Sequence, residues 1–222
     1  MKESRRRRRQ HSRPSSKQRS RFDTLKVSMP HTKPDIVLII GRPGSGKGTQ
    51  AKLLAKRLGW IRLSSGDLIK EIRDGNEPFS ERVREMYDKG TLLPDWFADY
   101  LLESGLLELE PHVGVIAEGF GRTESQAKHF NEIISWLGRR LLVLNLDVSE
   151  DEARRRMLDR AKTQDRPDSD GEEKITERFT KFREETEPGL AFFRELGLVA
   201  EIDGEQSPEE VASAIESVLK KA

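Results

Sequence analysis

The sequence predicts an α/β fold in which a five-stranded parallel sheet is flanked by helices. Short apolar runs alternate with helical segments from Asp35 onward, which is typical of a parallel sheet. A glycine-rich loop at residues 41–50 joins the first apolar run to the first helical segment, and this strand–loop–helix arrangement suits phosphate binding. With 222 residues, the chain can form one such domain with small appendages.

Each expected strand is a short apolar run. Residues 36–40 are continuously apolar, as in a central strand that is buried on both faces. The other four runs are residues 61–63, 113–117, 141–146 and 198–202. Helical spacing and capping residues predict helices at 51–58, from Ser149 through Arg160 with a capping box to Glu152, from Ile175 to near Pro188, and from Ser207 onward.

Two segments interrupt the alternation of strands and helices. Residues 64–93 are expected to form a helical excursion between the second and third strands. Residues 161–172 are expected to form a polar loop between two helices. Polar excursions beside a phosphate-binding loop are candidate lids, because such segments often close over bound ligands.

Composition excludes several classes of protein. The chain has no cysteine, which rules out disulfides and thiolate zinc sites. It has no apolar run long enough to cross a bilayer and no apolar segment typical of a signal peptide. We therefore expect a soluble, cytoplasmic protein without membrane contact.

Charge is distributed unevenly along the chain. Residues 1–34 carry 12 Lys and Arg against 2 Asp and Glu, a net charge of +10, whereas the remaining 28 against 37 give −9. We expect residues 1–34 to be a disordered basic tail and residues 35–222 to form the domain. The tail could bind nucleic acid or another polyanion, act as an organelle-targeting peptide, or have no specific role.

The glycine-rich loop departs from the strict phosphate-loop pattern at one position. Its glycines let backbone N–H groups point inward, and Lys47 can place its ammonium group on the outer phosphates. The strict pattern has Ser or Thr directly after the lysine, whereas here Gly48 comes first and Thr49 follows. A glycine-rich turn without a ligand would explain the loop alone, but its neighbours favour phosphate binding.

Two polar clusters follow strands, at the carboxyl edge where parallel sheets bind ligands. Ser65 and Lys70 follow the second strand, although Ser65 could instead cap the next helix. Arg122 follows the third strand and can grip a phosphate group with two N–H donors. Gln126 lies near it, but Thr123 and Gln126 also match a capping box.

Four further arginines lie in the C-terminal half. Arg156 and Arg160 are four residues apart and share a helix face. A basic face exposed to solvent, without a ligand, would also explain this spacing. Arg166 lies in the polar loop and Arg178 on the following helix. With Lys47, these cations suit phosphoryl transfer, in which charge spreads over the equatorial oxygens. An acceptor phosphate is already anionic, so such a reaction requires no general base.

Taken in order, these motifs resemble the adenylate kinase family of nucleoside monophosphate kinases. The matching segments are Gly41-x-Pro43-Gly44-x-Gly46-Lys47-Gly48-Thr49-Gln50, Ser65-Gly66-Asp67-Leu68, Gly90-x-Leu92-Leu93-Pro94-Asp95 and Gly119-Phe120-x-Arg122-Thr123-x-x-Gln126. Arg156, Arg160, Arg166 and Asp168, followed by Arg178 and Glu187-Pro188, resemble the family's short-lid form. The resemblance covers about residues 35–220 and accounts for Gly48, because that family has glycine after the lysine.

The resemblance implies reversible transfer of the terminal phosphoryl group from MgATP to AMP, giving two ADP. It also implies a monophosphate-binding arm at 64–93 and a lid at 157–170. The implied ATP-binding residues are Gly44, Ser45, Gly46, Lys47, Gly48, Thr49, Arg156 and Arg160. The implied AMP-binding residues are Ser65, Gly66, Lys70, Leu92, Leu93, Gly119, Arg122, Gln126, Arg166 and Arg178. The implied catalytic residues are Lys47, Arg122, Arg156, Arg160, Arg166 and Arg178.

Several residues depart from the family pattern and leave alternatives open. Ser65 stands where threonine is common, and Asp168-Ser169 stands where two aspartates are usual. Lys70 stands where arginine is usual, Glu118 replaces an aspartate, and Gly121 replaces a proline. The implied Mg²⁺ travels with the nucleotide and has no direct protein ligand, although Glu118 could reach its water shell. The alternatives are a UMP/CMP-type kinase and a catalytically weak nucleotide-binding protein with an RNA-binding tail. By analogy with the family, we expect a monomer.

Overall fold

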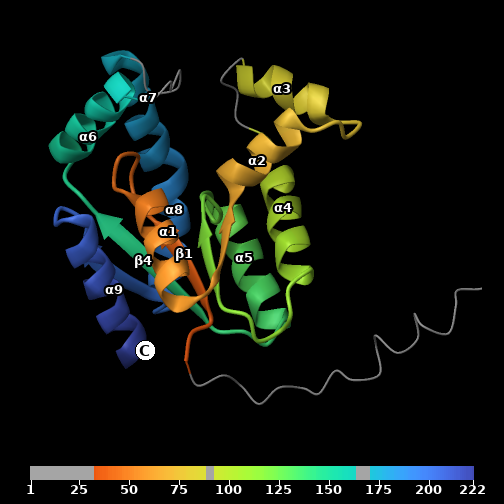
Figure 1. Cartoon of the computed structure of the whole chain (residues 1–222), viewed down its shortest axis with the longest axis vertical. Helices are drawn as coiled ribbons and strands as arrows, with labels where there is room; N and C mark the ends of the chain where they lie inside the picture. Colours follow the sequence, from red (N-terminus) through yellow and green to blue (C-terminus); the bar gives the residue numbers. More distant parts are fainter. Residues whose placement is uncertain (1–32, 89–92, 164–170) are drawn as a thin grey trace, which may run out of the picture. The chain divides into compact units, whose positions relative to one another are not determined.

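A computed structural model describes residues 33–88, 93–163 and 171–222 (Figure 1). Its centre is a parallel sheet of five strands in the order β2-β3-β1-β4-β5. The strands are β1 (Ile36–Ile40), β2 (Ile61–Ser64), β3 (Val115–Glu118), β4 (Leu141–Asp147) and β5 (Val199–Asp203). The predicted fold class is confirmed, and every predicted strand is present with its ends shifted by at most two residues.

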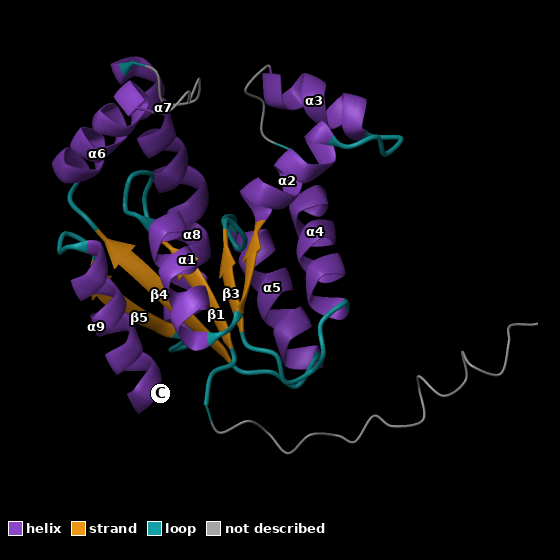
Figure 2. Cartoon of the chain, in the orientation of Figure 1, coloured by secondary structure: helices purple, strands orange, loops and turns teal. Residues whose placement is uncertain are grey.

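Helices connect these strands (Figure 2). They are α1 (Lys47–Leu58), α2 (Ser65–Asp74), α3 (Ser80–Asp88), α4 (Asp95–Leu107), α5 (Glu124–Trp136), α6 (Glu150–Thr163), α7 (Glu172–Lys181), α8 (Glu187–Glu195) and α9 (Pro208–Lys221). Both α2 and α3 belong to the predicted excursion, and α4 continues the helical path to β3. The predicted polar loop starts later than expected, because α6 extends through Thr163.

Alternate residues of β1 enter two different cores, which explains its unbroken apolar run. Ile36, Leu38 and Ile40 pack with apolar side chains of α4, α5 and α8 on one face of the sheet. Val37 and Ile39 pack with α1 and α9 on the other face. A third, smaller core joins α6 to α7. The sheet is thus covered on both faces, as a central parallel strand requires.

The helix predicted to end near Pro188 does not end there. A π-helical turn, η3 (Phe182–Thr186), links α7 to α8, and Pro188 lies in the first turn of α8. The amide N–H groups of a first helical turn need no intrahelical acceptor, so proline is tolerated at that position. The prediction was wrong because proline is also a common helix stop.

The capping box predicted at the start of α6 is only half formed. Ser149 Oγ accepts a hydrogen bond from the Glu152 N–H over 3.4 Å, as predicted. The reciprocal bond is missing, because the Ser149 N–H donates to Glu205 Oε1 instead, over 2.9 Å. The start of α6 is therefore tied to the loop that follows β5.

A buried ion pair closes the end of the sheet opposite the strands' carboxyl ends. Arg139 Nε donates to Asp35 Oδ2 over 3.0 Å, and these side chains are only 4% and 11% exposed. Arg139 also donates to the carbonyl of Val113, and the Arg140 N–H donates to Asp35 Oδ1 over 3.0 Å. The pair therefore joins the chain segments that enter β1, β3 and β4.

Some predictions fall on residues that the structure does not describe. Residues 1–32 cover nearly all of the predicted basic tail, and Leu92, Arg166 and most of the predicted lid loop also lie outside the described ranges. Among the helices of the described residues, none combines the length and the apolar character that crossing a membrane requires.

Candidate active site

The glycine-rich loop lies between the carboxyl end of β1 and the start of α1. Gly44 and Gly46 have φ angles of +87° and +92°, which side chains of L-residues rarely allow. A Cβ atom on Gly44 would lie 2.5 Å from the carbonyl oxygen of Ala153, so the loop also packs tightly against α6. Both glycines are needed to hold this path, as the sequence pattern predicts.

Lys47 is held by the loop that precedes it. Its Nζ atom donates to the carbonyl oxygens of Gly41 over 2.6 Å and Arg42 over 2.9 Å. The residue is half-buried, and its ammonium group is closely surrounded by protein atoms. This loss of hydration, reinforced by the charges of Arg122 and Arg178, lowers the pKa of Lys47 from 10.5 to about 7.

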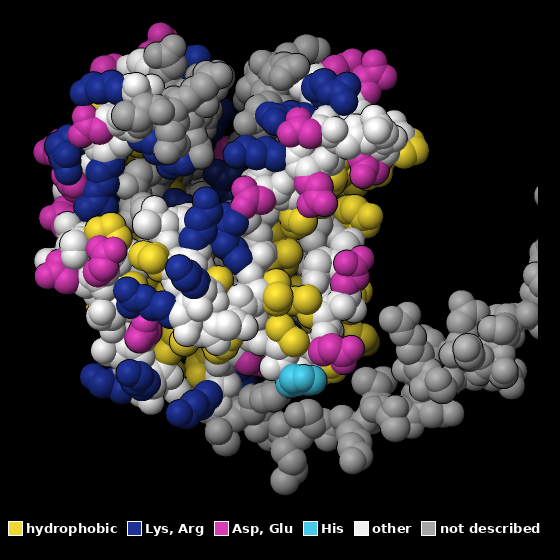
Figure 3. All heavy atoms as spheres, viewed as in Figure 1, with side chains coloured by type: hydrophobic (Ala, Val, Ile, Leu, Met, Phe, Trp, Pro, Cys, Tyr) yellow, Lys and Arg dark blue, Asp and Glu magenta, His cyan; other side chains and the backbone are white. Residues whose placement is uncertain are grey.

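Several of the predicted cationic residues converge on Lys47. Arg122, Arg178 and Arg160 each act on its ammonium group electrostatically, and Glu118 opposes them. They come from the end of β3, from α7 and from α6, which are distant in sequence. Figure 3 shows a hollow between the α6–α7 side and the α2–α3 side of the molecule, with Lys and Arg side chains along it. The structure thus brings together four of the six predicted catalytic residues.

Arg122 retains solvent contact, but neighbouring atoms remove most of its hydration. This desolvation, followed by the positive charge of Arg178, lowers the pKa of Arg122. Two guanidinium groups and an ammonium group in one hollow repel one another, and a polyanion would relieve that repulsion. The electrostatics therefore favour a ligand that carries several negative charges.

Arg156 points toward a different part of the site. Its Nε donates to Glu152 Oε1 over 2.6 Å, and its two terminal nitrogens donate to the carbonyls of Gly204 (2.9 Å) and Glu205 (3.2 Å). These bonds hold the guanidinium between α6 and the loop after β5. Arg156 is thus fixed by hydrogen bonds rather than part of a loosely solvated face.

Ser65 does not cap α2. The alternative interpretation, in which Ser65 is the capping residue, is therefore wrong. Ser64 is the cap, since its hydroxyl accepts a hydrogen bond from the Asp67 N–H over 3.4 Å. Ser65 Oγ instead donates to the carbonyl of Gly119 over 3.0 Å. A Cβ on Gly119 would lie 2.2 Å from Ser65 Oγ, so glycine is needed for the ends of β2 and β3 to approach. The structure therefore brings Ser65 and Gly119 together.

Gln126 is buried and has more than a capping role. Thr123 Oγ1 accepts from the Gln126 N–H over 3.2 Å, which is the first half of a capping box. The Gln126 amide does not complete that box: its oxygen accepts from the Arg122 N–H over 2.9 Å, and its nitrogen donates to Asp95 Oδ1 over 2.9 Å. Asp95 also accepts from Thr123 Oγ1 over 2.8 Å. The amide thus links α4 to the backbone of Arg122.

Sequence reasoning missed Arg62, which lies in β2. Its guanidinium forms ion pairs with Asp67 in α2 and with Glu118 at the end of β3. The hydrogen bond from Arg62 lowers the pKa of Asp67. The sequence offered one signal: Arg62 is a charged residue in a short apolar strand, two positions before the strand's carboxyl end. It suggested no partner, because Glu118 is 56 residues away.

The remaining predicted contacts are less closely tied to the cluster around Lys47. Lys70 and Gly66 are exposed on α2, and Leu93 is half-buried just before α4. Lys70 acts electrostatically on Asp67 and Asp74. Leu92 and Arg166 lie outside the described residues, so the structure neither places them in the site nor excludes them.

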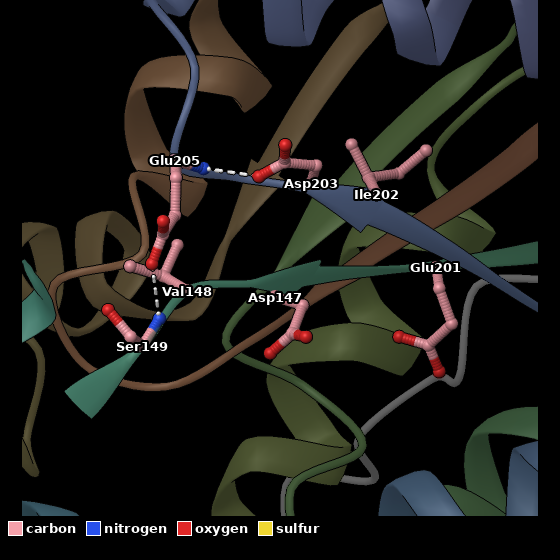
Figure 4. Close-up of a pocket in the computed structure, with 7 residues that line it drawn as sticks. All are labelled: Asp147, Val148, Ser149, Glu201, Ile202, Asp203 and Glu205. Atoms are coloured by element: carbon pink, nitrogen blue, oxygen red, sulfur yellow. Dashed lines mark hydrogen bonds between the residues drawn. The ribbon is translucent and has the colours of Figure 1, made fainter.

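A separate pocket of about 230 Å³ lies between the ends of β4 and β5 (Figure 4). Its lining includes the acidic residues Asp147, Glu201, Asp203 and Glu205, with Val148, Ser149 and Ile202. Glu205 bonds to the Ser149 N–H, and its own N–H donates to Asp203 Oδ1 over 2.9 Å. The carboxylates of this pocket would repel phosphate groups. The cationic hollow is therefore the better phosphate site.

Carboxylate oxygens beside the glycine-rich loop fit Mg²⁺ bound to a nucleotide. The carboxylate of Glu118 lies over Gly48, where a Cβ would be 3.4 Å from Glu118 Oε2. Asp67 shares Arg62 with Glu118, so both acids face the same guanidinium. Mg²⁺ prefers such oxygen donors together with phosphate oxygens and water. In the described ranges, no group of three or more His, Cys, Asp or Glu side chains could hold a metal by itself.

Comparison with known proteins identifies the family. A family model described as "Adenylate kinase" matches residues 39–198. The adenylate kinase of Thermus thermophilus is 40% identical over 184 residues, which cover 82% of this chain and 96% of that protein. The adenylate kinases of Thermobifida fusca and Maricaulis maris are 35% and 34% identical, with 83% of this chain covered in each case and 97% and 98% of the relatives.

The chain belongs to the adenylate kinase family. It is therefore an enzyme of the phosphoryl-transferring kinases, and the resemblance seen in its motifs is confirmed. The family and its relatives support ATP and AMP as substrates and do not favour the UMP/CMP-type alternative.

Proposed function

We propose that the cluster around Lys47 holds the phosphate groups of MgATP and AMP and promotes reversible phosphoryl transfer between them, giving two ADP. The observation that carries this proposal is the electrostatic contact of Lys47 with Arg122, Arg160 and Arg178, which come from three separate elements. Cations that come from several elements can hold a donor and an acceptor phosphate in line, which is most of what phosphoryl transfer requires.

On the donor side, we assign the ATP phosphates to the loop Gly44, Ser45, Gly46, Lys47, Gly48 and Thr49. The N-terminus of α1 adds backbone N–H groups and positive helix dipole at the end of this loop. Arg160 and Arg156 belong to the same side, because both are on α6. Mg²⁺ carried by the nucleotide would neutralise phosphate charge. Glu118, whose carboxylate lies over Gly48, would accept hydrogen bonds from the metal's water ligands.

On the acceptor side, we assign AMP to Ser65, Gly66, Lys70, Leu93, Gly119, Arg122, Gln126 and Arg178, with Leu92 and Arg166 as further proposals from the sequence. Gln126 supports Arg122 directly, since its amide oxygen accepts the Arg122 backbone N–H. The acceptor phosphate is anionic, so the chain's residues need only orient it and stabilise charge in the transition state.

The remaining predictions from the sequence are part of the same proposal. We propose the segment 64–93 as the monophosphate-binding arm and 157–170 as the lid. The helices α2 and α3, which lie in the first segment, and the electrostatic effect of Arg160 of α6 on Lys47 support this division. The monomeric state stays a prediction from the family resemblance, and the cytoplasmic location stays a prediction from composition. Binding of a polyanion by residues 1–34 rests on their charge of +10.

A coupled assay with ATP and a panel of nucleoside monophosphates tests the proposed reaction. We expect ADP formation with AMP, little with CMP or UMP, and a loss of at least about a hundredfold in kcat for Arg178→Gln. Arg183→Gln is the matched control, because Arg183 is on the same helical stretch but pairs with Glu150 at the surface. Equal rates for the two variants, or no turnover with AMP by folded protein, would contradict the proposal.

A further inference from the structure

Arg62 occupies an unusual position for a cation of its kind. It lies in β2, an edge strand of the sheet, and its side chain is only 20% exposed. Its two terminal nitrogens reach different partners, Asp67 in the first turn of α2 and Glu118 at the end of β3. The guanidinium therefore bridges two carboxylates that come from separate elements.

One of these carboxylates, that of Glu118, lies at the edge of the proposed phosphate site. Glu118 acts electrostatically on Lys47, and its carboxylate lies over Gly48 in the glycine-rich loop. Its side chain is only 11% exposed, so its charge is weakly screened by solvent. On its other side the same carboxylate contacts Arg62. Arg62 and a nucleotide-bound divalent cation would thus compete for the same negative charge.

We propose that Arg62 is a positioning residue that weakens the dependence of nucleotide binding on Mg²⁺, by holding and neutralising Glu118 and Asp67. The proposal rests on the proposed function of the site. Without Arg62, the two carboxylates would lose the cation that contacts both of them, and they would repel metal-free ATP and attract a divalent cation more strongly. With Arg62 present, part of the metal's electrostatic role is already supplied by the protein.

The test compares ATP binding with and without the metal. Isothermal titration calorimetry gives the ATP affinity in excess Mg²⁺ and in EDTA, and the ratio of the two affinities measures the coupling. In Arg62→Gln we expect this ratio to rise about tenfold, because a unit charge is removed close to the metal. Paramagnetic resonance of Mn²⁺ bound with ATP should show tighter metal binding by a similar factor, independent of turnover.

Two further variants make the result interpretable. Arg62→Lys keeps the charge but cannot hold both carboxylates, so we expect a rise in the ratio of only about threefold. It also serves as the test if Arg62→Gln fails to fold. Arg57→Gln is the matched control, because Arg57 forms an ion pair with Glu216 at the surface, and its ratio should equal that of the wild type.

An unchanged ratio in Arg62→Gln, or one equal to that of Arg57→Gln, would overturn the proposal. An equal loss of ATP affinity with and without Mg²⁺ would also overturn it, because it would place Arg62 on the phosphates rather than on the carboxylates. Failure of the wild type to bind ATP, or to form ADP from ATP and AMP, would instead contradict the proposed function.

Discussion

At the scale of single residues, Lys47 is a strongly perturbed group in the site. Burial and the neighbouring arginines lower its pKa from 10.5 to about 7 in the nucleotide-free enzyme. The protonated form of Lys47 is therefore destabilised in the empty site, and ligand phosphates would remove that destabilisation. Such strongly shifted groups are common in functional sites, because the charge that is unfavourable without ligand is favourable with it.

Proton uptake should accompany nucleotide binding. The phosphates favour the charged form of Lys47 and raise its pKa, so at pH 8 the free lysine is mostly neutral and binding should take up close to one proton. Affinity should accordingly fall as the pH rises above about 7. Calorimetry with the bisubstrate analogue Ap5A in buffers of different ionisation enthalpy measures the uptake directly.

The control for this linkage is Lys47→Met, which removes the titrating group and keeps similar side-chain length. It should bind Ap5A more weakly and without the proton uptake seen in the wild type. Uptake that persists in Lys47→Met would show that another group is responsible.

Gly121 is a second residue whose environment is informative. Its φ angle is +61°, whereas proline, which the family resemblance leads one to expect there, is confined to a φ near −65°. A Cβ would also lie 3.2 Å from Leu38 and 3.3 Å from Phe193. The turn before Arg122 therefore has a backbone conformation that proline cannot adopt.

Restoring proline at this position should be harmful. We expect Gly121→Pro to lower the free energy of unfolding by at least about 3 kcal/mol and to raise the KM for AMP, because the turn positions Arg122. Gly138→Ala is the control for left-handed strain alone, since Gly138 has a φ of +66° and open space around it. It should cost about 1–2 kcal/mol in urea denaturation and leave the KM unchanged.

At the scale of elements, the strands were predictable and several connections were not. Residues 36–40 could be assigned from their composition alone, because a strand buried on both faces is apolar at every position. The continuation of the chain through Pro188 into α8 was missed, because the same proline could end one helix or begin another.

The site was predictable to the extent that its motifs are local. The sequence indicated Lys47 and Arg122 through the loops around them, and the structure brings both together. The roles of Arg62 and Gln126 were beyond local reasoning, because their partners Glu118 and Asp95 are 56 and 31 residues away. Such pairs follow only from strand order and helix packing.

The buried ion pair between Asp35 and Arg139 should contribute most to stability among the described ion pairs that join different elements. Removing one partner of a buried pair leaves an uncompensated charge, so we expect Arg139→Met to lower the free energy of unfolding by about 3–5 kcal/mol. Urea denaturation measures the loss. The same variant should keep its KM for AMP while folded, because this ion pair lies at the opposite end of the sheet from the site.

Arg57→Gln serves as the control for this prediction too. Its ion pair with Glu216 leaves the side chains 35% and 27% exposed, and pairs of this kind contribute about 0–1 kcal/mol. If Arg139→Met lowers the free energy of unfolding no more than Arg57→Gln does, the role assigned to the Asp35–Arg139 ion pair is contradicted.

At the scale of the whole molecule, charge divides the chain. Residues 1–34 carry +10 and the remainder −9, although the net charge is only +1. The family match begins at residue 39, so the basic segment precedes the part that the family model describes. Catalysis and polyanion binding should therefore be separable along the chain.

Deletion of residues 1–34 should abolish RNA binding and leave phosphoryl transfer intact. The remaining chain would carry a net charge of −9 and would repel phosphate backbones outside the cationic hollow. Fluorescence anisotropy with labelled RNA at several salt concentrations measures binding, and for the full chain the logarithm of the affinity should fall linearly with the logarithm of the salt concentration. Arg→Gln replacement at Arg5, Arg6, Arg7, Arg8 and Arg9 should flatten that slope without changing kcat. RNA binding that survives the deletion would assign the polyanion contact to the domain instead.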